Sequence, residues 1–108
     1  MNIKIKKILN KKNKLKIICL TAYSKNFAEE VDKYADITLV GDSLGSVLYN
    51  YNSTKKVTLT NMIDHSKSVR MGVKKSLMVV DMPYKTYKSN SSALKNARKI
   101  IKETKCDA

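Results

Sequence analysis

The sequence predicts an α/β protein built around a parallel sheet. Three short apolar runs, at residues 16–21, 37–40 and 77–80, are each followed by a segment with apolar residues at helical spacing. This alternation is typical of parallel strands joined by helices. The runs carry almost no polar residues, which is typical of strands that are covered on both faces.

The first strand is expected at Lys16–Thr21, where most residues are apolar and several are β-branched. Ser24 is a favourable N-cap, and a helix is expected from there to about Tyr34. The second strand is expected at Ile37–Val40 and ends at Gly41. These elements form the first strand–helix unit and the start of the second.

A longer connection, residues 43–60, is rich in turn-forming residues, with a short extended piece expected at 57–59. The second helix is expected at Asn61–Met71, with Thr60 as its N-cap and Gly72 at its end. This helix completes the second unit.

The third strand is expected at Leu77–Val80, where Asp81 ends the apolar run. After a polar loop, Ser89 or Ser91 is expected to cap a third helix. The last three residues, 106–108, are typical of the approach to a fourth strand. The chain therefore holds three strand–helix units.

The chain carries a net charge of +13, which raises the hypothesis of a basic module that binds nucleic acid. Nearly all of this charge comes from lysines spread along the chain, without the interleaved aromatic residues typical of RNA binding. We therefore favour a solvated lysine-rich surface and expect no nucleic-acid partner. No apolar run is long enough to cross a membrane, and we expect none as partner. The two cysteines are expected to be reduced thiols in a cytoplasmic protein.

Two of the predicted strands end in an aspartate. Asp42 follows the second strand and Asp81 follows the third. The carboxyl ends of parallel strands gather ligands, and neighbouring strands lie about 4.8 Å apart. Two carboxylates with open positions beside them suit Mg²⁺, whereas without a cation they would repel each other.

A structural role competes with this interpretation, because an aspartate after a strand often caps the next turn. Ser43 is either a turn residue or a hydroxyl donor to a ligand. Tyr23 and Thr21 follow the first strand and reach the same sheet edge, where we expect packing. His65 is expected to pack or to lie at the surface.

By strict alternation, an inward-pointing Asp42 predicts that Thr38 and Val40 share its face. In the same way, Leu77 and Val79 are expected to share the inner face with Asp81. If the two aspartates lay on opposite faces of the sheet, they could not share a cation.

Five motifs follow one another along the chain: LTAYS (20–24), LVGDSLG (39–45), YNSTKKVTL (51–59), DHSKSVRMG (64–72) and VVDMPYKTY (79–87). In order and spacing they resemble the ketopantoate hydroxymethyltransferase family, and the resemblance runs from about residue 16 to the end. Several positions depart from the pattern: Ser24 replaces an aspartate, Asn52 an acid, Lys55 and Lys56 a Leu-Pro pair, and Asp64 an aromatic residue. We interpret these departures as drift.

The resemblance implies a (β/α)8 TIM barrel, typically a homodecamer. It implies Mg²⁺-dependent transfer of a one-carbon unit from 5,10-methylenetetrahydrofolate to 3-methyl-2-oxobutanoate, giving 2-dehydropantoate in pantothenate biosynthesis. It also implies that Asp42 and Asp81 bind the metal and that Asp42, Ser43 and Asp81 contact the keto acid. The metal would polarise the keto-acid carbonyl, so that an enolate forms and attacks the one-carbon donor.

A full barrel takes about 250 residues. The 108 residues are therefore expected to be the N-terminal part of one barrel domain, with 1–15 as a basic lead-in, truncated before the fourth strand. The resemblance puts the catalytic base beyond Ala108, so the chain alone is expected to be inactive. Two alternatives stay open: another Mg²⁺-dependent keto-acid barrel enzyme of the lyase type, and the nucleic-acid-binding module.

Overall fold

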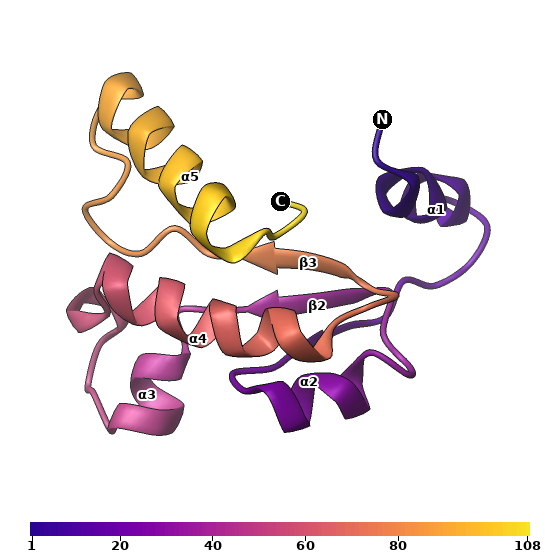
Figure 1. The fold of residues 1–108 in the computed structure, drawn as a ribbon, viewed down its shortest axis with the longest axis horizontal. Helices are drawn as coiled ribbons and strands as arrows, with labels where there is room; N and C mark the ends of the chain where they lie inside the picture. The colour runs from indigo at the N-terminus through magenta and orange to yellow at the C-terminus, as the bar shows by residue number, and fades with distance from the viewer.

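The computed structural model describes all 108 residues and shows an α/β fold with three parallel strands (Figure 1). The predicted alternation of strands and helices is confirmed, and three further helical segments, α1, α3 and η1, add to it. In chain order the elements are α1 (Ile3–Lys11), β1 (Cys19–Thr21), α2 (Lys25–Val31), β2 (Ile37–Val40), α3 (Leu44–Tyr49), the 3₁₀ turn η1 (Thr54–Lys56), α4 (Leu59–Gly72), β3 (Leu77–Val80) and α5 (Asn90–Thr104).

The sheet has the strand order β1-β2-β3, with every neighbouring pair parallel. The predicted bounds of β2 and β3 are confirmed. The first strand is shorter than the predicted Lys16–Thr21, because only Cys19–Thr21 finds register partners on β2. The end of β2 therefore lies between the ends of β1 and β3.

The last residues of the chain extend the sheet beyond β3. The N–H groups of Asp107 and Ala108 donate to the carbonyl of Met78 at 2.9 and 3.1 Å, and the N–H of Val80 donates to the carbonyl of Ala108 at 3.0 Å. These bonds set Ala108 beside β3 in the manner of a parallel neighbour. The predicted approach to a fourth strand is confirmed.

One face of the sheet carries the hydrophobic core. Helix α4 packs against β2 and β3, with α2 and α5 on either side of it (Figure 1). Burying these apolar side chains is the main stabilising contribution to the fold. Fully buried members of this core, at 0% exposure, are Ala22, Ala28, Val40, Leu44, Met62, Val69 and Met78.

The alternation predicted for Val79 and Val80 of β3 is confirmed, whereas the face predicted for β2 is wrong. Val40 is fully buried in the core with Val80, its register partner, and Thr38 shares this helix-covered face. Leu39 pairs with Val79 on the opposite, partly exposed face. The parity argument fails because the chain leaves strand geometry after Val40, so alternation does not carry through to Asp42.

Capping side chains fix where two of the helices begin. Thr58 accepts a hydrogen bond from the N–H of Asn61, and the Asn61 side chain accepts one from the N–H of Thr58, which is a capping box. The predicted cap at Thr60 is therefore wrong, because the N-cap is Thr58, two residues earlier. Ser89 caps α5 in the same manner, as predicted.

Helix α1 lies at the end of the sheet where the strands begin (Figure 1). Asn2 caps this helix and also donates to the carboxylate of Asp107 at 2.9 Å. At the other end of the helix, Lys11 pairs with Asp36 at 2.5 Å. None of the helices combines the length and apolar character needed to cross a bilayer, and both cysteines are free.

A buried aspartate holds the segment before β3. The Asp32 carboxylate accepts the N–H groups of Lys74, Lys75 and Ser76 at 2.8–3.0 Å, and the Ser76 hydroxyl donates to it at 2.8 Å. The Ser76 proton is committed to this bond, so the Thr38 hydroxyl, 2.6 Å away, donates to Ser76. Burial alone would raise the pKa of Asp32, but these hydrogen bonds together hold it below its ordinary value.

Candidate active site

The two aspartates predicted from the strand ends lie next to each other. Asp42 follows β2, Asp81 follows β3, and the two strands are paired up to Val40 and Val80. The backbone N–H of Asp42 donates to Oδ2 of Asp81 at 3.0 Å, and the N–H of Asp81 donates to the carbonyl of Val40 at 3.0 Å. The structure thus brings the pair together at the carboxyl edge of the sheet.

The electrostatics of this pair favour a cation. Burial and the neighbouring negative charge of Asp81 raise the pKa of Asp42 above its ordinary value. Both side chains are partly buried, and no lysine or arginine forms an ion pair with either one. A divalent cation between the carboxylates would remove their repulsion.

The donor set fits Mg²⁺. No group of three or more histidine, cysteine, aspartate or glutamate side chains gathers anywhere in the chain, so Asp42 and Asp81 stand as a pair. Protein-bound Mg²⁺ commonly takes one or two carboxylates and completes its shell with water and substrate oxygens. Two carboxylates at an open sheet edge leave room for such oxygens.

A hydroxyl pair lies beside the acids. The Ser43 Oγ is 2.7 Å from the Tyr23 hydroxyl, which joins the loop after β1 to the turn after β2. Gly41 lies between this pair and Asp81: a Cβ added there would be 3.2 Å from Ser43 Oγ and 3.5 Å from Asp81 Oδ2. Because glycine carries no side chain, no Cβ stands between the Ser43 hydroxyl and the Asp81 carboxylate.

His65, the only histidine, forms its hydrogen bonds with Tyr23 and Tyr49 and not with the two aspartates. His65 Nδ1 is 2.9 Å from the backbone carbonyl oxygen of Tyr23, and its Nε2 is 2.7 Å from the Tyr49 hydroxyl. A carbonyl oxygen only accepts, so Nδ1 carries the proton and, in the neutral ring, Nε2 accepts from Tyr49. The expected packing role of His65 is consistent with these contacts, which fix the backbone of Tyr23.

Sequence reasoning did not foresee two features of this site. Tyr23 was expected to pack, yet its hydroxyl contacts Ser43. Its position two residues after β1 was the available signal, because Asp42 follows β2 at the same offset. The space at Gly41 had no sequence signal beyond the glycine itself.

A family comparison bears on what these residues do. The family model described as ketopantoate hydroxymethyltransferase matches residues 2–108, almost the whole chain. The chain belongs to the ketopantoate hydroxymethyltransferase family. The resemblance found in the five sequence motifs is therefore confirmed.

Curated relatives carry the name 3-methyl-2-oxobutanoate hydroxymethyltransferase. The chain is 68% identical to the protein of Pelagibacter ubique over all 108 residues, which make up 42% of that protein. It is 50% identical to the Rhizobium etli protein over 93 residues, 85% of this chain and 34% of the relative. It is 46% identical to the Anaplasma marginale protein over 108 residues, or 39% of the relative. The chain thus spans about two fifths of the length of these hydroxymethyltransferases.

Within this hydroxymethyltransferase-family chain, the roles assigned to the site residues stay predictions. Asp42 and Asp81 are the predicted metal ligands, and Asp42, Ser43 and Asp81 are the predicted contacts to substrate. The geometry is compatible with these roles, because the three side chains come from neighbouring segments at one sheet edge.

Proposed function

We propose that the protein acts as a 3-methyl-2-oxobutanoate hydroxymethyltransferase in pantothenate biosynthesis. The reaction transfers a one-carbon unit from 5,10-methylenetetrahydrofolate to 3-methyl-2-oxobutanoate and gives 2-dehydropantoate. The observation that carries this proposal is the pair Asp42 and Asp81 at the carboxyl ends of adjacent parallel strands. Family membership selects this reaction from those that a pair of carboxylates can support.

Asp42 and Asp81 would hold one Mg²⁺ ion. Bound there, the ion would act as a Lewis acid on the keto-acid carbonyl and make the neighbouring C–H more acidic. The carboxylates would also keep the keto acid at the end of β2. Burial, and to a smaller extent the charge of Asp81, raises the pKa of Asp42, so cation binding would favour the ionised form of Asp42.

Ser43 would donate a hydrogen bond from its hydroxyl to an oxygen of the keto acid. A phenol is more acidic than a serine hydroxyl, so in the 2.7 Å contact Tyr23 is the better donor and Ser43 the acceptor. The Ser43 proton is then free to point at the ligand. Tyr23 would thus be a positioning residue, held in turn by His65.

The wider architecture of this proposal is a (β/α)8 barrel in which these 108 residues form three successive units. Three features support it: the strands follow chain order, the sheet face with Leu39 and Val79 is not covered by helices, and β1 has no neighbour on its outer edge. No imidazole or third carboxylate gathers with the acid pair. From the family resemblance, we place the catalytic base outside these residues and the working enzyme in a homo-oligomer.

Binding of the keto acid tests the role of the acid pair without requiring the base. Binding is measured by isothermal titration with 3-methyl-2-oxobutanoate, with and without Mg²⁺, and should depend on Mg²⁺. Asp42→Asn and Asp81→Asn should each weaken this binding about 10-fold or more, because each removes one partner of a charged contact. Asp64→Asn is the matched control, since Asp64 is an exposed residue of α4 without an ion pair. Equal affinity in all four proteins would contradict the proposed function.

Turnover tests the position of the base. Incubation of the 108-residue protein with the keto acid, 5,10-methylenetetrahydrofolate and Mg²⁺ should form no 2-dehydropantoate. Formation of this product would show that the base lies within these residues. Cleavage of a keto acid instead would favour the lyase alternative.

A further inference from the structure

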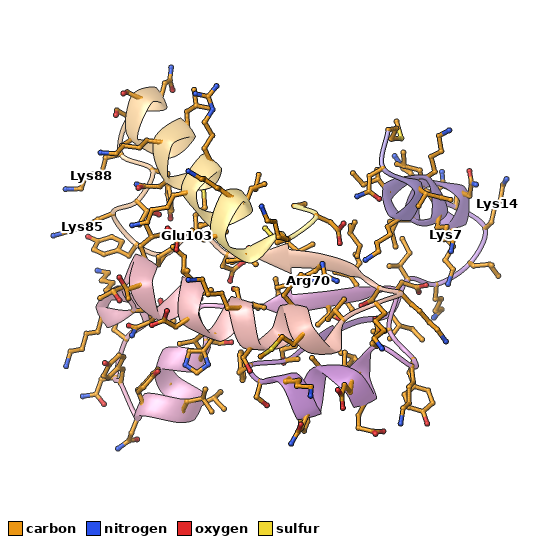
Figure 2. All side chains as sticks on the ribbon, viewed as in Figure 1. Lys7, Lys14, Arg70, Lys85, Lys88 and Glu103 are labelled. Carbon is orange, nitrogen blue, oxygen red and sulfur yellow. The ribbon has the colours of Figure 1, made fainter.

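Lysines gather on the loops that surround the carboxyl edge of the sheet. Lys55 lies on η1 after β2, and Lys85 and Lys88 lie on the segment between β3 and α5. All three are exposed, and none forms an ion pair. Figure 2 shows Lys85 and Lys88 at the end of the molecule where the strands finish, far from Lys7 on α1. Their charge is therefore available to a ligand at the same end as the acid pair.

One tyrosine ring brings two of these lysines together. Lys55 Nζ is 5.3 Å from the centroid of the Tyr84 ring, and Lys85 Nζ is 5.6 Å from it. These distances are those of cation–π contacts, which hold an ammonium group against an aromatic face. Two positive charges from two different loops are thus kept near each other in spite of their repulsion.

The backbone of this segment supports the same arrangement. Lys85 has a φ of 67°, in the left-handed region that residues other than glycine rarely adopt. Such strained conformations are concentrated at ligand sites, where the surrounding structure maintains them. A cavity of about 220 Å³ opens here, lined by Tyr84, Lys85, Tyr87 and Lys88. Tyr84 follows Asp81 by three residues, and Figure 2 shows Lys85 and Lys88 at the end of the molecule where the strands finish, so the cavity lies at the same end of the sheet as the acid pair.

We propose that this lysine–tyrosine rim, Lys55, Tyr84, Lys85, Tyr87 and Lys88, binds the carboxylate-bearing chain of the second substrate. This inference rests on the proposed function, in which the second substrate is a reduced folate. Folates carry γ-linked glutamates, so each added residue brings one carboxylate along a flexible chain. The acid pair repels that chain and the rim attracts it, which directs the chain outward and leaves the keto acid beside Asp42.

The side chains of the rim favour charges spaced along a chain over one compact anion. No arginine belongs to it, so it lacks the planar fork that binds a single carboxylate or phosphate with two parallel hydrogen bonds. The cations are single ammonium groups spread over two loops, which matches charges spaced along a chain better than one compact anion. The tyrosine ring orders the ammonium groups before binding, and such preorganisation lowers the entropic cost of association.

The probe is tri-γ-glutamate, with free glutamate as its single-residue reference. Binding to the 108-residue protein is measured by titration, and Lys85→Gln/Lys88→Gln is compared with Lys7→Gln/Lys14→Gln. Both double variants lose two positive charges, and Figure 2 places the second pair at the opposite end of the molecule. This comparison separates the rim from the general attraction of a +13 protein for anions.

The rim predicts that tri-γ-glutamate binds more tightly than glutamate. Exposed ion pairs are each worth a factor of about 2 to 5, so the Lys85/Lys88 variant should bind about 5-fold more weakly and the control variant within about 2-fold of wild type. Tyr84→Leu, which leaves the net charge unchanged, should weaken binding about 2-fold by releasing the lysines. An equal loss in both double variants would overturn the proposal, as would tighter, rim-dependent binding of an oligonucleotide of the same charge.

The keto acid provides the independent control. Mg²⁺-dependent binding of 3-methyl-2-oxobutanoate, measured on the same samples, depends on the acid pair and should be unchanged by Lys85→Gln/Lys88→Gln. Absence of keto-acid binding in wild type would refute the proposed function, while the tri-γ-glutamate series alone decides the rim. The two failures are thereby distinguished.

Discussion

Replacing Asp81 with asparagine tests the electrostatics of the acid pair. The change removes one negative charge but keeps an oxygen that accepts the N–H of Asp42, a bond now 3.0 Å long. Two carboxylates about 5 Å apart, the spacing of neighbouring strands, repel by about 1 kcal/mol in water and about 3 kcal/mol at an effective dielectric constant near 20. Since both acids are partly exposed, we expect the lower part of this range, about 1–2 kcal/mol.

The sign of the effect follows from the raised pKa of Asp42. Burial first, and then the Asp81 charge, make the folded protein bind this proton more tightly than the unfolded chain does. The associated stability is present below the pKa of an unfolded aspartate and is lost as pH rises through the folded pKa. Without Mg²⁺, the contribution of Asp42 to stability should therefore be lost as pH rises above about 4, the pKa of an unfolded aspartate, and Asp81→Asn should lose about 1 kcal/mol less.

Urea unfolding at a series of pH values measures this difference. Asp64→Asn carries the same change in charge on the exposed surface of α4 and should follow wild type across the range. A constant difference in the free energy of unfolding between Asp81→Asn and wild type, from pH 4 to pH 7, would show that the two carboxylates do not interact.

Three further substitutions test other parts of the structure. Gly72→Ala should lower the free energy of unfolding in urea by about 1–3 kcal/mol, because a Cβ there would press on the carbonyl of Lys25 and lie 3.0 Å from the Cβ of Ala28. An unchanged midpoint of urea unfolding would show that α2 and α4 separate easily. Asp32→Asn should cost about 3 kcal/mol or more, since it disturbs the buried carboxylate that accepts three backbone N–H groups, and a cost below about 1 kcal/mol would contradict that role. Tyr23→Phe should weaken Mg²⁺-dependent keto-acid binding about 2- to 10-fold when it is made in the wild-type protein. The same change should have no effect in a protein that already carries Ser43→Ala. Equal losses in both would mean that Tyr23 does not act through Ser43.

The strands and the acid pair could be predicted because their signals are local. Ile37–Val40 and Leu77–Val80 are short apolar runs, each bounded by a residue that ends it, and their predicted limits match the structure. Once the strands were placed as parallel neighbours, the meeting of Asp42 and Asp81 followed from topology alone. The family resemblance then indicated the chemistry, and the family comparison confirms the family.

The elements that sequence reasoning missed are stabilised by distant contacts. Helix α3 has only six residues and includes Gly45, where an added Cβ would lie 3.1 Å from the Tyr51 ring. Its formation depends on packing against the segment around η1 rather than on helix propensity. Helix α1 buries no residue fully and is held by Asp36 and Asp107, whose approach no pattern within the first 15 residues reveals.

The face of β2 was misjudged for a geometric reason. Alternation was counted backward from Asp42, which lies in a turn after Gly41 and not in the strand. Counting from the register with β3 gives the correct result, because Val40 and Val80 are partners in the core. Pairing fixes the face of a strand, whereas a residue beyond its last hydrogen bond is free of that constraint.

We propose that Asp42 and Asp81 jointly hold a divalent cation at the ends of β2 and β3. Mn²⁺ can replace Mg²⁺ at oxygen-ligand sites and broadens the NMR signals of nearby nuclei. In a titration of isotope-labelled protein, we expect selective broadening of the amide signals of Gly41–Ser43 and of Asp81, reversed by excess Mg²⁺ and abolished by Asp42→Asn. Broadening centred on other acids such as Asp64 or Glu103, with the ends of β2 and β3 unaffected, would refute this shared site.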